Sequence, residues 1–470
     1  MRGRSESQLS LFRVLRRALA PAGVIGLLAV APSCNSLTGA EDLAVGPSLP
    51  SDGVLDGGIP DAAAPDALDP PDASRVPTPA YGLDGWSFRR PVVLASDEMA
   101  PLVKHAVLVV IPPTFDYSHA SPNADDLRFT TDVARADELP YFVEDWTPGG
   151  TSHVWVSVPN VPSGPSLLHV FYGKPSAAPV SSFGSTFPNA RRTSGGGAGS
   201  FVATGDIDVD WFELRAGDTL TLAAGVPLRI SARRILIAGM ILGTGKGSPG
   251  GALPMAAGTG PGGGMIVAGS GAGGGGHGGV GGRGGSDTNN AGGAGGVAYG
   301  ALAGVDIEMG SGGGTMDSKP AGAGGGAITL VGWRVSVTSA ITMDGGIGGG
   351  LSGQNSGGGS GGGILIGGWS VDLAGATLGV SGGAGGPCAG SANDGGGGGG
   401  GGRVKIRRRA SGSFVPASSV LLAGGLGGTG AGTTAPGSPG APGTTNVNDA
   451  STFAPGVETS LGAETAAAAP

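Results

Sequence analysis

The sequence predicts an all-β protein: an antiparallel β-sandwich followed by a glycine-rich parallel β-helix, with a disordered N-terminal spacer and C-terminal tail. Three observations carry this prediction. Aromatic residues and short alternating apolar runs concentrate between residues 81 and 190. Glycine supplies 101 of the 470 residues, about three times its average share. Between the glycine blocks, one pattern of three short strands recurs.

The N-terminus has the order of an export signal. Residues 1–17 are basic, residues 18–31 (ALAPAGVIGLLAVA) are apolar but short for a bilayer span, and APSCNS follows. The position of Cys34 resembles the lipobox of bacterial lipoproteins, although Pro32 is an unusual occupant of its site. The resemblance implies a signal peptide over 1–33, acylation of Cys34, and membrane lipid as a partner. A signal peptide cleaved nearby and a retained anchor helix are the alternatives.

Two segments are predicted to be disordered. Residues 34–80 form a spacer whose portion 41–80 holds eight prolines and eight acidic residues against one basic residue, Arg75. Such a mixture buries too little apolar surface to fold and stays extended. The tail, 446–470, shows no clear pattern and is also expected to be disordered.

Residues 81–190 are expected to form the β-sandwich. HAVLVVI (105–111), HVWVSVP (153–159) and LLHVFYG (167–173) are typical of strands, and clusters of proline and glycine separate them. Four ordered blocks are similar to a bacterial domain of unknown function, 2341: WSFRR, DDLRFT, LPYFVEDW with VWVSVP, and FYG. The resemblance covers about 83–190 and implies a module of exported, multidomain surface proteins without a known reaction.

A ligand platform is the functional hypothesis for the sandwich. Val154, Val156 and Val158 alternate with Trp155, so valines in the core place Trp155 on the outer face. With Trp146 and Arg128, Trp155 is the candidate ligand-binding set, because an aromatic face suits the C–H groups of a sugar ring. Polysaccharide is therefore the candidate ligand class. The alternative is that these side chains belong to the core.

Residues 216–445 are expected to form the β-helix, after a connector over 191–215. Apolar pairs recur with equal spacing at 328/330 and 335/337, at 364/366 and 371/373, and at 228/230 and 235/237. Trp333 and Trp369 hold the same place in two of these units. Stacked coils would bury the pairs together. The glycine blocks between coils are expected to be mobile or to pack as extended backbone on one another.

Composition and motifs favour a role without catalysis. The first 33 residues carry a net charge of +4, so the rest carries −12, and no basic stripe suggests a nucleic-acid partner. Asp206, Asp208 and Asp210 share a strand face, which is interpreted as solvated rather than as a metal or catalytic site. We expect no catalytic residues, metal or cofactor. We expect a structural or adhesive envelope lipoprotein of the outer membrane; a polysaccharide-degrading enzyme and an inert coat protein are the alternatives.

Overall fold

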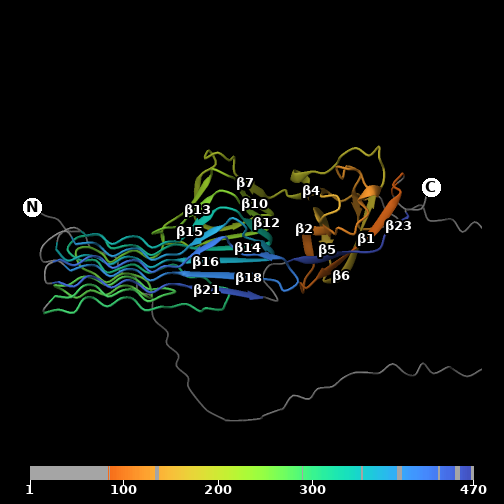
Figure 1. The fold of residues 1–470 in the computed structure, drawn as a ribbon. Helices are drawn as coiled ribbons and strands as arrows, with labels where there is room; N and C mark the ends of the chain where they lie inside the picture. The colour runs from red at the N-terminus through yellow and green to blue at the C-terminus, as the bar shows by residue number, and fades with distance from the viewer. Residues whose placement is uncertain are drawn as a thin grey trace, which may run out of the picture. The chain divides into compact units, whose positions relative to one another are not determined.

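The computed structural model describes residues 83, 85–132, 137–287, 289–350, 353–388, 394–431, 434–449 and 456–466. All of them belong to one compact unit, Ser74–Pro470. The predicted signal peptide, Cys34 and the spacer 34–80 lie outside the described residues. The predicted fold class is confirmed, because antiparallel and parallel sheets make up nearly all of the regular structure (Figure 1).

Two antiparallel sheets form the sandwich. The first has the order β22-β1-β6-β3, with β23 also paired to β1, and the second has the order β2-β5-β4. Their bounds are β1 Phe88–Ser96, β2 Leu102–Ile111, β3 Arg128–Thr130, β4 Tyr141–Asp145, β5 Ser152–Val161, β6 Gly164–Tyr172, β22 Val457–Leu461 and β23 Thr465–Ala466; the short helices are η1 Tyr117–His119 and α1 Phe183–Thr186. The inward valines of β5 pack in the core between the sheets, as the alternation predicts.

The C-terminal strands of the sandwich depart from the expected disordered tail. Residues 457–461 of β22 pair with Ser96–Val92 of β1, and Val457 is buried in the core. The Thr459 hydroxyl donates to the Leu108 carbonyl of β2 at 2.8 Å, so β22 also contacts the second sheet. Upstream, β21 (Thr444–Asp449) pairs with β18 of the β-helix. Residues 450–455 and 467–470 lie outside the described residues.

Two parallel sheets form the β-helix, whose strands lie in the sequence between β6 and β22 of the sandwich. The larger sheet contains β7 Ala190–Arg192, β9 Gly205–Asp208, β10 Trp211–Leu214, β12 Leu228–Ile237, β14 Ala327–Val337, β16 Gly363–Asp372, β18 Arg403–Arg408, β19 Phe414–Val415 and β21. The smaller sheet contains β8 Phe201–Ala203, β11 Thr219–Leu222, β13 Met240–Leu242, β15 Ala340–Thr342, β17 Thr377–Gly379 and β20 Ser419–Leu421. The predicted connector 191–215 is therefore part of the β-helix.

The recurring pairs stack in the predicted register. Leu228, Ile328, Ile364 and Val404 are successive partners along the larger sheet. The inward side chains fill one core between the two sheets. Outside this core, the Trp333 and Trp369 rings stack with centroids 5.6 Å apart and planes 3° from parallel. Equal spacing in the sequence therefore corresponds to equal height in neighbouring coils.

The glycine blocks form a bundle of extended chains that projects sideways from the stacked coils of the β-helix, roughly along the direction of its strands (Figure 1). We call these chains, within 243–326, 343–363, 379–402 and 422–443, the glycine bundle. In the segment 354–363, residues 357, 358 and 359 donate backbone hydrogen bonds to three different chains, at Gly314, Gly397 and Gly346. Residues 360, 361 and 362 repeat this order, at Ser311, Gly400 and Met343. A repeat of three residues is the period of a polyproline II-type helix.

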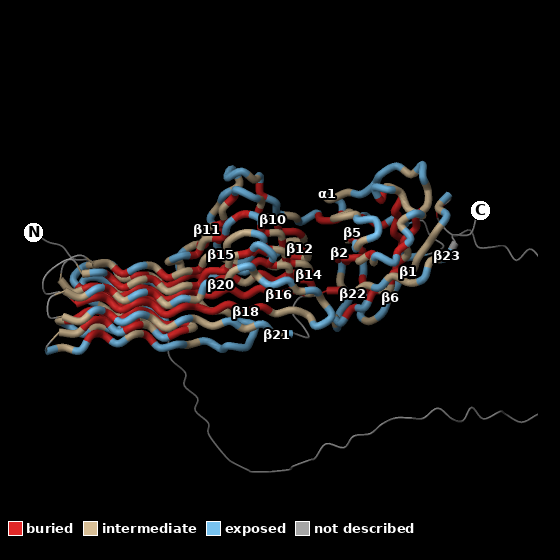
Figure 2. Tube along the Cα trace, viewed as in Figure 1, coloured by how far each residue is buried: buried red, intermediate tan, exposed pale blue. Residues whose placement is uncertain are grey.

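Three other chains donate to the same segment. Gly275 donates to Gly358, Gly322 to Gly357, and Gly383 to Gly359. The segment 354–363 is thus surrounded by six chains, and every side of its backbone faces a neighbour. Segments 270–277 and 394–403 lie against it and against each other, and the bundle interior is buried (Figure 2). Of the two expectations for the glycine blocks, packing as extended backbone is confirmed.

Close packing explains why the central chains are glycine. A Cβ atom built on Gly399 would lie 1.9 Å from the Gly359 carbonyl oxygen, and one on Gly357 would lie 2.0 Å from that of Gly273. Side chains fit where a chain borders solvent. In 434–443 the outward positions are Pro436, Pro439 and Pro442, which lack an N–H and need no acceptor there.

Candidate functional site

The predicted platform residue Trp155 points to the outer face of the sandwich, but it is not exposed. Its exposed fraction is 0%, and it packs in an aromatic cluster with Phe187, Trp211 and Trp333. Trp211 and Trp333 come from the β-helix, which therefore covers this face. The expectation of an exposed Trp155 is wrong, because a second module of the same chain occupies the surface that the strand pattern identified.

A largely buried carboxylate lies at the centre of this interface. Glu144 of β4 accepts a hydrogen bond from Trp155 Nε1 at 2.8 Å and contacts Arg234 Nε at 2.7 Å and Arg334 Nη1 at 3.0 Å. Burial alone would raise the pKa of Glu144, but the two guanidinium groups outweigh burial and hold that pKa below its usual value. We call Glu144, Trp155, Arg234 and Arg334 the interface cluster.

The other two predicted ligand residues serve the sandwich itself. Trp146 is half-buried and packs edge-on against Phe115 and Tyr117, away from Trp155. The Arg128 side chain is buried, which agrees with the alternative that these side chains belong to the core. Its guanidinium donates to the Leu127 and Ala178 carbonyls at 2.6 and 2.7 Å, and its Nε lies 3.1 Å from Glu138. The structure does not bring the three predicted residues together.

The blocks that suggested the family meet in the folded sandwich. The buried Asp126 carboxylate accepts hydrogen bonds from the Gly173 and Ser121 N–H groups at 2.7 and 2.9 Å. Trp86 Nε1 donates to the Asp126 carbonyl at 2.6 Å. Gly173 has φ +87°, and a Cβ there would lie 2.5 Å from the Phe88 ring. These blocks thus hold distant strands together.

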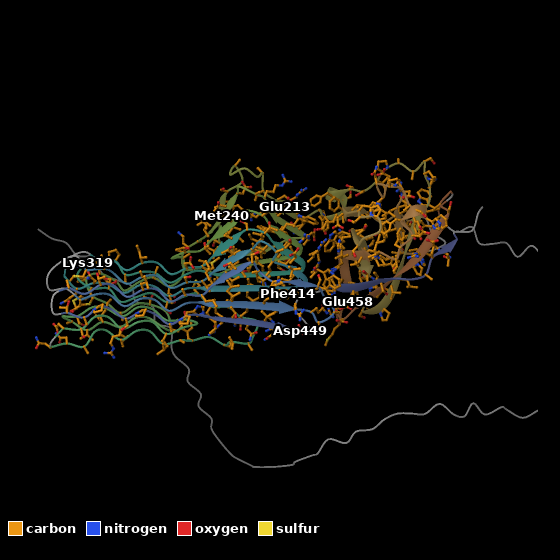
Figure 3. The ribbon with its side chains drawn as sticks, in the orientation of Figure 1. Glu213, Met240, Lys319, Phe414, Asp449 and Glu458 are labelled. Atoms are coloured by element: carbon orange, nitrogen blue, oxygen red, sulfur yellow. The ribbon has the colours of Figure 1, made fainter. Side chains whose placement is uncertain are left out.

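Polar side chains gather at the end of the glycine bundle remote from the β-helix, which we call the tip. Lys319 marks this end (Figure 3). The Asp317 carboxylate accepts from the Gln354 N–H at 2.9 Å, and Lys319 Nζ donates to the Gln354 carbonyl at 3.3 Å. An open hollow of about 300 Å³ lies here, lined by Arg283, Ser286, Asp287, Asn289, Asn290, Ala291 and Gly292. Sequence patterns gave no sign of this tip, because its loops meet only when the bundle is assembled.

The described residues contain no group of three or more His, Cys, Asp or Glu side chains placed to hold a metal ion. Asp206 and Asp208 are exposed on β9, and Asp210 is half-buried where its carboxylate accepts from the Asn189 N–H at 3.0 Å. Cys388 is half-buried in the bundle and is not in a disulfide. Over the same described ranges, no helix has the length and hydropathy that a bilayer crossing requires.

A family model, the domain of unknown function DUF2341, matches residues 123–191. The resemblance seen in the sequence is confirmed over these residues, which run from the loop before β3 to β7. No curated protein and no solved structure gave a significant match to the chain.

Proposed function

We propose that the protein is a non-enzymatic, lipid-anchored component of the bacterial cell envelope with a structural role and an adhesive tip. The glycine bundle carries this proposal. Its central chains are mainly glycine backbone held by hydrogen bonds to their neighbours, and at most of their positions a Cβ atom would collide with a neighbouring chain, so little space is left for catalytic side chains. A scaffold of this kind resists bending because its central chains are bound on all sides. It is suited to holding its end at a fixed distance.

The tip is the part of the bundle suited to contact a ligand. Its hollow presents a guanidinium, a carboxylate and two amides, groups that exchange hydrogen bonds with the hydroxyls of a polysaccharide. The predicted sandwich platform is covered by the β-helix, so the proposal assigns polysaccharide contact to the tip instead.

Binding by the full chain tests the adhesive part. The folded protein is screened against bacterial and plant polysaccharides, beside Arg283→Ala at the tip and Arg229→Ala as a matched control. Arg229 is exposed on β12 and does not line the hollow. We expect Arg283→Ala alone to lose binding. Failure of the folded parent to bind any member would remove adhesion from the proposal, and an equal loss in both variants would place binding elsewhere.

Fractionation tests the anchor. The position of Cys34 after an apolar segment motivates acylation at its sulfur. We expect the parent in the membrane fraction and Cys34→Ala in the soluble fraction. A Cys34→Ala chain that stays with the membrane would reject lipid anchoring while leaving the role of the bundle open to its own test.

A further inference from the structure

Three inner chains of the glycine bundle surround a common axis. We call them the axis chains: 270–277, 354–363 and 394–403. Ala272 donates to the Asn355 carbonyl at 3.0 Å, and Gly397 donates to the Ala272 carbonyl at 2.8 Å. Gly358 donates to the Gly397 carbonyl at 2.9 Å, so the hydrogen bonds pass around all three chains. With three residues to a turn, every third residue of each chain therefore faces the axis.

The residues that face the axis change from glycine to polar residues at the tip. Asn355 lies three residues before Gly358, and Asp394 lies three residues before Gly397, so both occupy positions that face the axis. Asn355 is 0% exposed and Asp394 is 3% exposed. Asn355 Nδ2 donates to the Asp394 backbone carbonyl at 3.1 Å. The two residues thus meet at the tip end of the axis.

Two oxygen atoms at this end of the axis are buried without a hydrogen-bond partner, Asn355 Oδ1 and Asp394 Oδ1. An amide oxygen and a carboxylate oxygen only accept hydrogen bonds, so neither can satisfy the other. Within the described ranges, no ion pair includes Asp394. Burial, and then the negative charge of Asp287, raises the pKa of the Asp394 carboxyl. A bound cation would satisfy both oxygens and balance the negative charge.

We propose that the tip end of the axis binds a calcium ion through Asn355 Oδ1 and the Asp394 carboxylate. Asp287 supplies a second carboxylate beside them, and its Oδ1 accepts from the Asn289 and Asn290 N–H groups at 2.7 and 2.6 Å. Calcium accepts carboxylate, amide and water oxygens in a flexible geometry, so two acidic side chains suffice. This inference goes beyond the proposed envelope role and does not depend on polysaccharide binding at the tip.

Isothermal titration calorimetry of the full chain with calcium chloride, without any polysaccharide, tests the proposal. We expect one ion per chain and a dissociation constant of about 10⁻⁴–10⁻³ M, as in extracellular calcium modules. Asp394→Asn keeps the shape of the side chain and removes its charge, so it should raise the dissociation constant at least about 10-fold. Asp206→Asn is the matched control, because Asp206 is an exposed carboxylate on β9 and should leave the dissociation constant unchanged.

Thermal melting with and without calcium gives a second readout. We expect calcium to raise the Tm of the parent and of Asp206→Asn but not that of Asp394→Asn, since a ligand stabilises only the folded state that binds it. If Asp394→Asn does not fold, Asp287→Asn takes its place in both comparisons.

Three results would overturn the proposal. The first is a folded parent that neither releases or absorbs heat with calcium nor changes its Tm, as expected if a proton or a water molecule satisfies the two oxygens instead. The second is a variant at Asp394 that binds calcium as tightly as the parent. The third is an equal loss of binding in Asp206→Asn, which would place the ion elsewhere.

Discussion

Replacement of one central glycine by alanine is expected to destabilise the whole bundle. In Gly399→Ala the new Cβ would lie 1.9 Å from the Gly359 carbonyl oxygen, whereas ordinary contacts begin at 3.4 Å. One chain must therefore retreat by about 1.5 Å. Its neighbours prevent this, because Gly399 also donates to Gly383 at 2.8 Å and accepts from Gly425 at 2.7 Å.

The magnitude follows from two terms. Overpacking of a filled interior costs about 1–3 kcal/mol, and each of the two strained hydrogen bonds contributes about 1 kcal/mol. We expect a loss of about 3–5 kcal/mol in the free energy of unfolding and a fall of about 5 °C or more in Tm. Thermal melting followed by circular dichroism measures this.

Ala384→Ser is the control for this substitution. It adds one atom to a residue on the solvent side of the same lattice. We expect it to melt within about 1 °C of the parent. Equal melting of Gly399→Ala and the parent would refute the argument that steric contact between chains requires glycine.

Four further predictions concern the sandwich and its interface. Glu144→Gln leaves two arginines partly buried without their carboxylate, so we expect a loss of about 3–5 kcal/mol in urea unfolding at pH 7; an unchanged midpoint would contradict this. Because the pKa of Glu144 is lowered by folding, its carboxylate stabilises the folded state fully above pH 4.5, and this contribution is lost as the pH falls through the folded-state pKa. Below pH 4.5 the free energy of unfolding should therefore depend less on pH in Glu144→Gln than in the parent. Burial, and to a lesser extent Arg233, lowers the pKa of His105 to about 3, so between about pH 6.5 and 3 the unfolded chain binds more protons than the folded chain. The free energy of unfolding should therefore decrease as the pH is lowered through this range, and His105→Gln should make that decrease smaller. An identical pH profile for the variant and the parent would exclude His105 as its source. Truncation after Asp449 removes β22 and the buried Val457, so we expect faster proteolysis of residues 85–172 in the folded chain; an unchanged proteolysis rate would show that β22 is dispensable.

The coils of the β-helix could be predicted from the sequence because each coil must place apolar residues at the same positions as the coil on which it stacks. Ile230, Leu330 and Ile366 share a register position that could be derived by aligning the sequence with itself. The opposite directions of Trp155 and the valines of β5 were also predictable, since side chains alternate along a strand.

Contacts between distant segments could not be predicted in this way. Trp155 and Arg234 come from different modules, and nothing in either local pattern pairs them with Glu144. The tail lacked a strand pattern, yet β22 is held by an edge of β1 that only the folded sandwich presents. The glycine blocks left two structures open, mobile loops and packed extended chains, because both can have the same high glycine content.

For the export that we propose, the order of strands in the sandwich has a consequence for folding. Leu108 and Thr459, which share a hydrogen bond, are 351 residues apart in the chain. A polypeptide that crosses a membrane N-terminus first therefore delivers β1 and β2 long before the strand that completes them. The β-helix lies between and can add its coils one after another as they emerge. In the proposed export, the sandwich is completed only after the last coil has been delivered, and a prematurely terminated chain keeps an unpaired edge on β1, where a protease can act.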